Sequence, residues 1–211
     1  MIITKLGHCC LIIEEQGLRI LTDPGEYSTL QKEVKDIDLI LITHEHADHL
    51  HVDSLKTVLE NNPDAKIITN HGVGKILNEK GIPHEFLERG QEKVINGLKL
   101  EGHGDRHADI YETVPVVQNT GYFIGGRLFY PGDALYNPQK SVEILALPVA
   151  GPWLKISDSI NYAKIIQPKI CFPVHDGMLK FLGPVHFLPD KFLTPLGIKF
   201  IVPEENRTIS F

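Results

Sequence analysis

Residues 39–50 read Leu39-Ile40-Leu41-Ile42-Thr43-His44-Glu45-His46-Ala47-Asp48-His49-Leu50. The apolar and β-branched residues that open this stretch are typical of a strand buried on both faces. Three histidines and an aspartate follow the strand at once. Side chains two apart in an extended segment point to the same side, so His44 and His46 can bind one metal ion together. Asp48 and His49 lie where we expect the chain to turn into a helix, and they face a second point where another ion can bind.

The spacing of this motif excludes one mechanism. A zinc-protease helix has the pattern His-Glu-x-x-His, with its two histidines four residues apart. Here the fourth residue after His44 is Asp48. Imidazole and carboxylate donors still suit zinc, manganese or iron(II). The alternative is a solvated, histidine-rich turn that binds nothing, which composition alone can produce, although seldom directly after a buried strand.

The composition limits the class of protein. A chain of 211 residues, 42% hydrophobic and 23% charged, can form one sizeable core, and we predict one domain over residues 1–211. No apolar run reaches the ~20 residues that cross a bilayer. Three cysteines, two of them the neighbours Cys9 and Cys10, favour a reduced, cytoplasmic protein. The net charge of −6, without a basic stretch, argues against a nucleic-acid partner.

Hydrophobic patterning predicts strands that alternate with helices, followed by hairpins. Helical spacing covers residues 53–61 and 72–80, each followed by a short strand, and this alternation predicts a sheet covered by helices. Hairpins are predicted over residues 93–100, around Asn96-Gly97, and over residues 116–130.

Further metal-binding residue types occur where predicted strands end. Asp23 follows one strand, Asp133 follows Pro131-Gly132, and His175 ends the strand at 169–174. The loop at 101–109 contains His103 and His107, of which we expect one to be a ligand; their spacing does not choose between them. The two aspartates can instead be turn-forming residues. Trp153, in a Pro/Gly-rich loop, either walls a substrate pocket or packs in the core.

The pattern His44-x-His46-x-Asp48-His49, followed by strand-end His, Asp and His in that order, resembles the metallo-β-lactamase superfamily. Within it, the chain is similar to small metal-dependent hydrolases such as the ascorbate-phosphate lactonase. The likeness covers nearly the whole chain. It implies an α/β (α+β) fold, a four-layer αββα sandwich with the metal site at one edge between two sheets.

The resemblance also implies roles for individual residues. His107 is chosen over His103 because relatives of this type show a Gly-x-x-His-Ala pattern there. Asp23 would support the site from behind, and the Gly7-His8 pair would lie near it, with His8 either lining the pocket or supporting a ligand. The first ion would be held by His44, His46 and His107, the second by Asp48, His49 and His175, with Asp133 bridging both.

We therefore expect a metal-dependent hydrolase. A hydroxide shared by two divalent ions would attack an ester, lactone, amide or phosphoester of a small molecule. Asp48 would take up a proton. Zinc is expected first, with manganese, nickel or iron open. The alternatives are a mononuclear-iron dioxygenase on the same fold and a metal-binding module without catalysis. The sequence identifies neither the substrate nor the oligomeric state.

Overall fold

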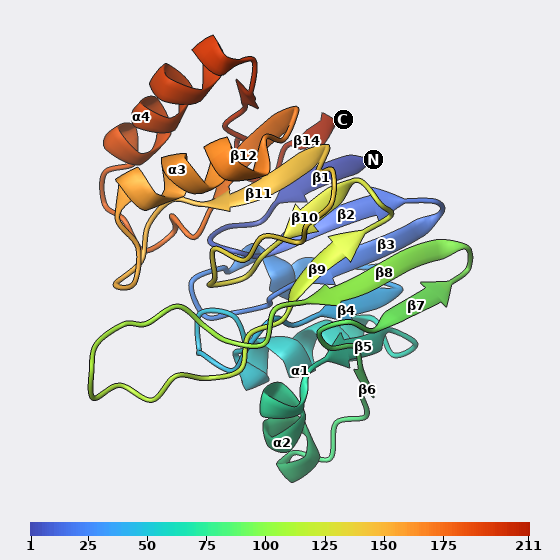
Figure 1. Ribbon diagram of the computed structural model, residues 1–211. Coiled ribbons are helices and arrows are strands. Elements are labelled where there is room, and N and C mark those ends of the chain that lie inside the picture. Colours follow the sequence, from blue (N-terminus) through green and yellow to red (C-terminus); the bar gives the residue numbers. More distant parts are fainter.

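The computed structural model describes residues 1–211, and two facing seven-stranded sheets form its centre (Figure 1). The first sheet has the order β14-β1-β2-β3-β4-β5-β6, formed by Thr208–Ser210, Ile2–Lys5, Leu11–Glu15, Leu18–Thr22, Leu39–Leu41, Lys66–Thr69 and Glu85–Phe86. The second has the order β13-β12-β11-β10-β9-β8-β7, formed by Lys199–Phe200, Ile170–Val174, Ile144–Pro148, Leu128–Tyr130, Gly121–Ile124, Leu98–His103 and Glu92–Ile95.

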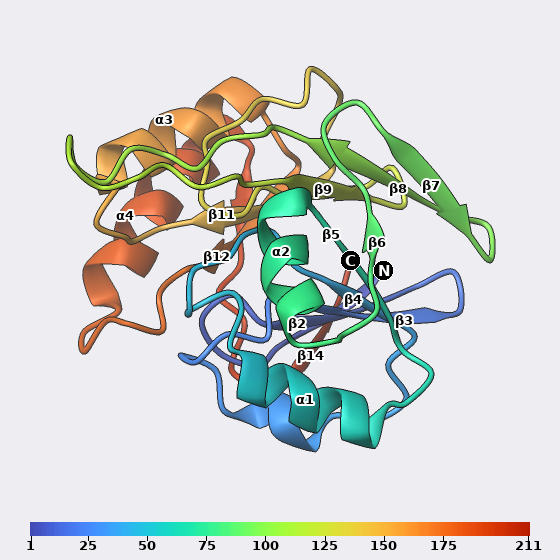
Figure 2. The same cartoon turned by 90° about the horizontal axis from the view of Figure 1, so that it is seen from below.

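Helices cover the outer face of each sheet (Figure 2). Side chains of α1 (Val52–Asn61) and α2 (His71–Glu79) pack on the first sheet. Those of α3 (Ile156–Ile166) and α4 (Gly183–Leu193) pack on the second. The 3-10 turns η1 (Leu30–Glu33) and η2 (Thr194–Leu196) complete the helical elements. This arrangement confirms the predicted αββα sandwich.

Strand β4 is buried on both faces, as its apolar sequence predicts. Leu39 and Leu41 join the core between the two sheets. Ile40, and Ile42 directly after the strand, join the layer beneath α1 and α2. Full burial of each such side chain contributes roughly 1.5–3 kcal/mol. The strand that leads into the histidine motif is therefore held firmly from two sides.

The two predicted hairpins have different outcomes. Strands β7 and β8 pair antiparallel around Asn96-Gly97, whose residues both have positive φ, as predicted. The second hairpin is formed by β9 and β10, but β9 begins at Gly121 and not at residue 116. The reason is that the residues just before it bond elsewhere: Thr120 N–H donates to the Thr43 carbonyl across the sandwich.

The histidine motif belongs to a set of loops that meet at one edge of the sandwich. The loop between β8 and β9 projects beyond the sheets on this side (Figure 1). No helix combines the length and the apolar character that crossing a bilayer requires.

Candidate metal centre

Seven histidine and aspartate side chains meet at this edge, arriving from loops of both sheets. Two groups contain all of them, and within each group the possible ligand atoms lie within 4.8 Å of one another. The first group follows β4 and β8, and consists of His44, His46 and His107. The second group follows β4, β10 and β12, and consists of Asp48, His49, Asp133 and His175. These are the seven residues that the sequence predicts as ligands.

Asp133 lies between the two groups. Its Oδ2 is 3.3 Å from His107 Nε2 and 2.8 Å from His175 Nε2. Its Oδ1 is 3.1 Å from His49 Nε2. Asp133 thus occupies the place expected of a bridging carboxylate.

Hydrogen bonds orient three of the imidazoles in the way that metal ligands require. The Nδ1–H of His49 donates to Asp23 Oδ2 at 2.8 Å, and that of His107 donates to the Ala108 carbonyl at 2.5 Å. The Nδ1 of His44 lies 3.0 Å from Thr43 Oγ1. In all three rings Nε2 is buried and makes no hydrogen bond. Ligating histidines have this pattern, because a bond at one nitrogen fixes the tautomer and leaves the other nitrogen for the metal.

Asp23 is the carboxylate that supports the site from behind. Its oxygens accept hydrogen bonds from Thr43 N at 2.7 Å, Thr43 Oγ1 at 2.8 Å and Tyr130 OH at 2.6 Å, besides that from His49. All of these groups are buried. This network links β3, β4 and β10, and so ties the histidine motif to both sheets.

Two site residues have a backbone conformation that is uncommon outside glycine. Asp23 has φ +36° and His175 has φ +63°. Such angles cost free energy and are concentrated at functional sites. Gly132, next to Asp133, also has a positive φ, of +64°. Only glycine fits there, because a Cβ would lie 2.3 Å from Asn119 Oδ1. Asn119 Oδ1 in turn accepts from Asp133 N at 3.0 Å.

The charges of the second group stabilise one another in the metal-free protein. Burial alone would raise the pKa of Asp133, but His49 and His175 lower it well below its usual value. Burial would likewise lower the pKa of His175, yet Asp133 and other neighbours raise it to about 10. The pKa of His49 is also raised well above its usual value, with Asp133 acting against the effect of burial. Protons on the imidazoles therefore balance the carboxylate charge when no metal is bound.

His8 lies behind Asp48 and does not line the pocket, so of the two positions expected from the sequence it has the supporting one. Its Nδ1 accepts a hydrogen bond from Gly177 N at 3.0 Å. The proton is therefore on Nε2, which lies 3.3 Å from Asp48 Oδ2. Burial would raise the pKa of Asp48, but His175 and His8 lower it, so Asp48 is ionised. His8 is a positioning residue for Asp48.

His103 lies away from the site, which corrects the expectation that it could contact the ligands or the pocket. Strand β8 includes His103, and its imidazole lies 3.3 Å from Glu101 and edge-on to Phe123 and Phe129 on the outer face. Only after the turn at Gly104, with φ +74°, does the chain bring His107 to the cluster.

Trp153 contacts the centre directly. Its Nε1–H donates to Asp133 Oδ2 at 2.8 Å, so the residue is more than packing. A cavity of about 190 Å³ opens over the cluster, and its walls include the apolar side chains of Trp153, Tyr27, Ile110 and Met178. The sequence analysis did not single out Tyr27, Ile110 and Met178, because nothing in the sequence relates their loops to the histidine motif.

Comparisons with known proteins agree with this geometry. The family model described as "Beta-lactamase superfamily domain" matches residues 2–175. The chain is 36% identical over 184 residues to protein Rv0786c of Mycobacterium tuberculosis, with 85% of each chain covered. It is 27% identical over 220 residues to the UPF0173 metal-dependent hydrolase MJ1163 of Methanocaldococcus jannaschii, with 96% of each covered. Its fold resembles that of Igni18, a metallo hydrolase from Ignicoccus hospitalis, with a TM-score of 0.77, 23% identity, and 100% and 97% of the two chains covered.

Proposed function

The chain belongs to the beta-lactamase superfamily, and from that premise we propose that it is a metal-dependent hydrolase of small molecules containing an ester, lactone, amide or phosphoester bond. The observation that carries the proposal is the convergence of seven metal-binding side chains from both sheets. The name of MJ1163, a metal-dependent hydrolase, supports it from a relative.

The side chains present fit two divalent ions, with zinc expected first and manganese, nickel or iron as alternatives. The Nε2 atoms of four buried imidazoles and one carboxylate oxygen make no hydrogen bond, as atoms reserved for an ion would. When bound, the ions would supply Lewis acidity and a water that ionises near neutral pH. The residues that would hold them are His44, His46 and His107 at one position and Asp48, His49 and His175 at the other, with Asp133 shared.

The protein's own groups then have separate tasks. Asp48 is ionised and is the most exposed carboxylate of the cluster, so it can accept the proton of the attacking water. His8 holds Asp48 in place, and Asp23 fixes the tautomer of His49. The apolar walls formed by Trp153, Tyr27 and Met178 would orient the substrate and exclude bulk water. The cavity volume of about 190 Å³ suits a small reacting portion.

Metal analysis together with a substrate panel tests the proposal. We expect two zinc or manganese ions per chain and hydrolysis of at least one class in a panel of esters, lactones, amides and phosphodiesters. His46→Ala and Asp133→Ala should remove both the activity and the corresponding metal. His71→Ala and Asp105→Ala, which change exposed residues outside the cluster, serve as matched controls.

Two results would contradict the proposal. Full hydrolysis by either cluster variant would show that the centre is not the site of reaction. One iron per chain with oxygen uptake would instead indicate a dioxygenase on the same fold.

A further inference from the structure

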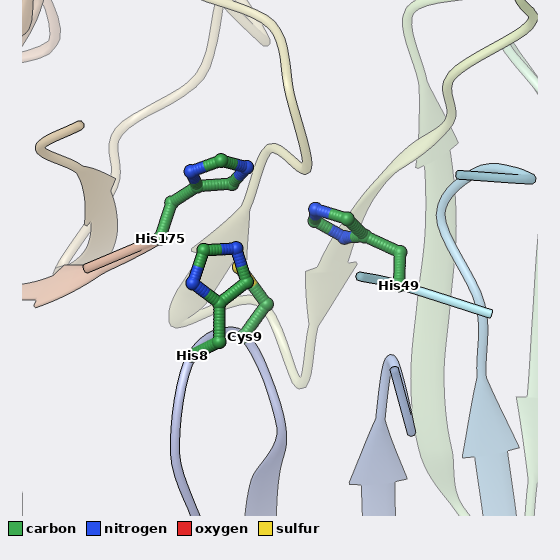
Figure 3. A group of neighbouring side chains, drawn as sticks. All are labelled: His8, Cys9, His49 and His175. Atoms are coloured by element: carbon green, nitrogen blue, oxygen red, sulfur yellow. The ribbon is translucent and has the colours of Figure 1, made fainter. Parts of the chain in front are cut away.

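A cysteine lies beneath the second group of ligands. Cys9, on the turn between β1 and β2, forms a third cluster with His8, His49 and His175, whose possible ligand atoms lie within 4.8 Å of one another. Figure 3 shows His49 and His175 approaching from opposite sides, with Cys9 and His8 below them on the same turn. All four residues are buried. The cluster shares His49 and His175 with the group that contains Asp48 and Asp133.

The imidazole of His175 is buried and makes no hydrogen bond. Both Nδ1 and Nε2 of this ring lack a hydrogen-bond partner, although only 1% of the residue is exposed. In His44, His49 and His107, by contrast, Nδ1 is bonded to an oxygen and only Nε2 is free. A buried polar atom without a partner is costly. An imidazole binds one ion through one nitrogen, and here that nitrogen is Nε2. The Nε2 atoms of His175 and His49 lie 2.8 and 3.1 Å from oxygens of Asp133 without a hydrogen bond, as expected of atoms that share an ion with it.

His8 is not available as a donor in this cluster. Its Nδ1 accepts from Gly177 N, and its Nε2–H faces Asp48. The remaining donors are the thiol of Cys9 and the imidazoles of His49 and His175. Asp48 and Asp133 line the cavity whereas Cys9 does not, so the sulfur lies on the inner side of the ion position.

We propose that Cys9 Sγ is an additional, inner ligand of the ion held by Asp48, His49, Asp133 and His175. This inference rests on the metal-binding part of the proposed function and is independent of hydrolysis. On coordination the thiol releases its proton to solvent, and a sulfur–metal bond forms. Thiolate is a soft donor, so this position favours zinc, cobalt or cadmium over manganese.

The neighbouring Cys10 provides a matched control. Successive side chains along an extended segment point to opposite faces. Cys9 joins the core between the sheets, whereas Cys10 joins the layer under α1 and α2. Both cysteines are buried and free of disulfides. Only Cys9 faces the ligand cluster.

Cobalt spectroscopy of the metal-stripped whole protein tests the proposal. On adding Co²⁺ we expect visible d–d bands, which report any bound cobalt, together with a near-ultraviolet sulfur-to-cobalt charge-transfer band. Cys9→Ser and Cys9→Ala should lose the charge-transfer band and keep the visible bands, and Cys10→Ser should keep both. Far-ultraviolet circular dichroism confirms that each variant is folded.

Two outcomes overturn the inference and differ in meaning. Visible bands without a charge-transfer band in the unaltered protein would leave the metal site intact and exclude the sulfur ligand. The absence of visible bands would overturn the metal site itself, and the inference with it.

Affinity measurements give a second readout that requires no substrate. We expect Cys9→Ala to weaken Cd²⁺ binding by at least the ~10-fold that loss of an outer contact to a ligand costs. Mn²⁺ affinity should change much less, since manganese prefers the oxygen and nitrogen donors that remain. An equal change for both ions would contradict a sulfur ligand.

Discussion

His8 shows how one side chain can serve the centre without reaching the cavity. Its two nitrogens have fixed partners, Gly177 N and Asp48 Oδ2. It therefore joins the loop after β4 to the loop after β12, the two loops that supply most of the second group. Loss of such an outer contact typically costs 10–100-fold in metal affinity or activity.

Glutamine and asparagine at position 8 can separate the two contacts of His8. The amide of glutamine reaches the place of Nε2, and that of asparagine reaches the place of Nδ1. Because Asp48 is the contact that matters for the ion, we expect His8→Gln to retain more metal affinity than His8→Asn, with His8→Asn weakened about 10- to 100-fold. Calorimetric titration with Zn²⁺ measures both. The reverse order would show that His8 acts through Gly177.

The loop at 101–109 contains a matched pair of histidines. Since His107 belongs to the cluster and His103 bonds to Glu101, we expect His107→Ala to lose one bound ion and the hydrolytic activity. His103→Ala should keep its metal content within error. Elemental analysis of the two purified variants decides between them, and metal loss in His103→Ala alone would refute the assignment.

These two histidines also mark the limit of prediction from single residues. The motif from His44 to His49 could be recognised because its members are adjacent in the sequence. The choice between His103 and His107 depended on where β8 ends and turns at Gly104, which the sequence pattern does not give. The bond from Tyr130 to Asp23 spans 107 positions, so nothing local could reveal it.

At the scale of elements, a buried ion pair fixes the end of β1 to the loop after β12. Lys5 Nζ lies 2.5 Å from Asp176 Oδ1 and donates to the Pro173 carbonyl at 3.1 Å. Asp176 Oδ2 lies 2.8 Å from His186 Nε2 on α4. Burial would raise the pKa of Asp176, but His186 and Lys5 keep it below its usual value.

Without the Lys5 ammonium, the buried carboxylate of Asp176 should retain only His186 as a partner. We expect Lys5→Met to lower the free energy of unfolding by about 3 kcal/mol, because breaking one partner of a buried pair costs this much. The double variant Lys5→Met/Asp176→Asn should be less destabilised than the sum of the single variants, by about 1 kcal/mol. Urea unfolding of all four proteins measures the coupling. Strict additivity would mean that the pair contributes nothing.

Elements with strong patterns were predictable, and short edge elements were not. The all-apolar β4 and the Asn96-Gly97 hairpin were identified from composition and turn chemistry. Strand β14 has three residues and exists only because it pairs with β1, near the other end of the chain. The start of helix α4 at Gly183 could not be read from the sequence, because a glycine and a proline form its first turn.

At the scale of the whole molecule, the two groups of ligands join the two sheets. Each group contains side chains from loops of both sheets. An ion bound at either group therefore stabilises the contact between the halves of the sandwich. Binding only to the folded state adds ~2.7 kcal/mol at a ligand concentration 100 times Kd.

Removal of metal should lower the melting temperature. At the stabilisation given above, the loss corresponds to about 5–10 °C for a chain of this size. Calorimetric scans before and after treatment with a chelator measure it, and returning Zn²⁺ should restore the value. A melting temperature that a chelator leaves unchanged would argue against ions at this position.

Raising the pH should lower the stability of the metal-free protein and raise its affinity for metal. The pKa of His175 is raised from 6.5 to about 10 by its acidic neighbours, acting against burial. Its ion pairs therefore stabilise the metal-free fold fully below pH 6.5, and this contribution is lost as pH rises to about 10. Metal binding must displace the same protons, so affinity should rise with pH over that range. Titration calorimetry in buffers of different ionisation enthalpy should detect proton release at pH 7.

Trp153 is the only tryptophan of the chain, and its indole bonds to Asp133. The molecule thus has a single indole fluorophore, which is one hydrogen bond from the shared carboxylate. A change in the partner of Asp133 Oδ2, such as metal binding, alters the intensity or wavelength of the tryptophan fluorescence. No second indole contributes to this signal. A paramagnetic ion such as Co²⁺ or Ni²⁺ would quench this fluorescence, so the unlabelled protein reports metal binding at its own site.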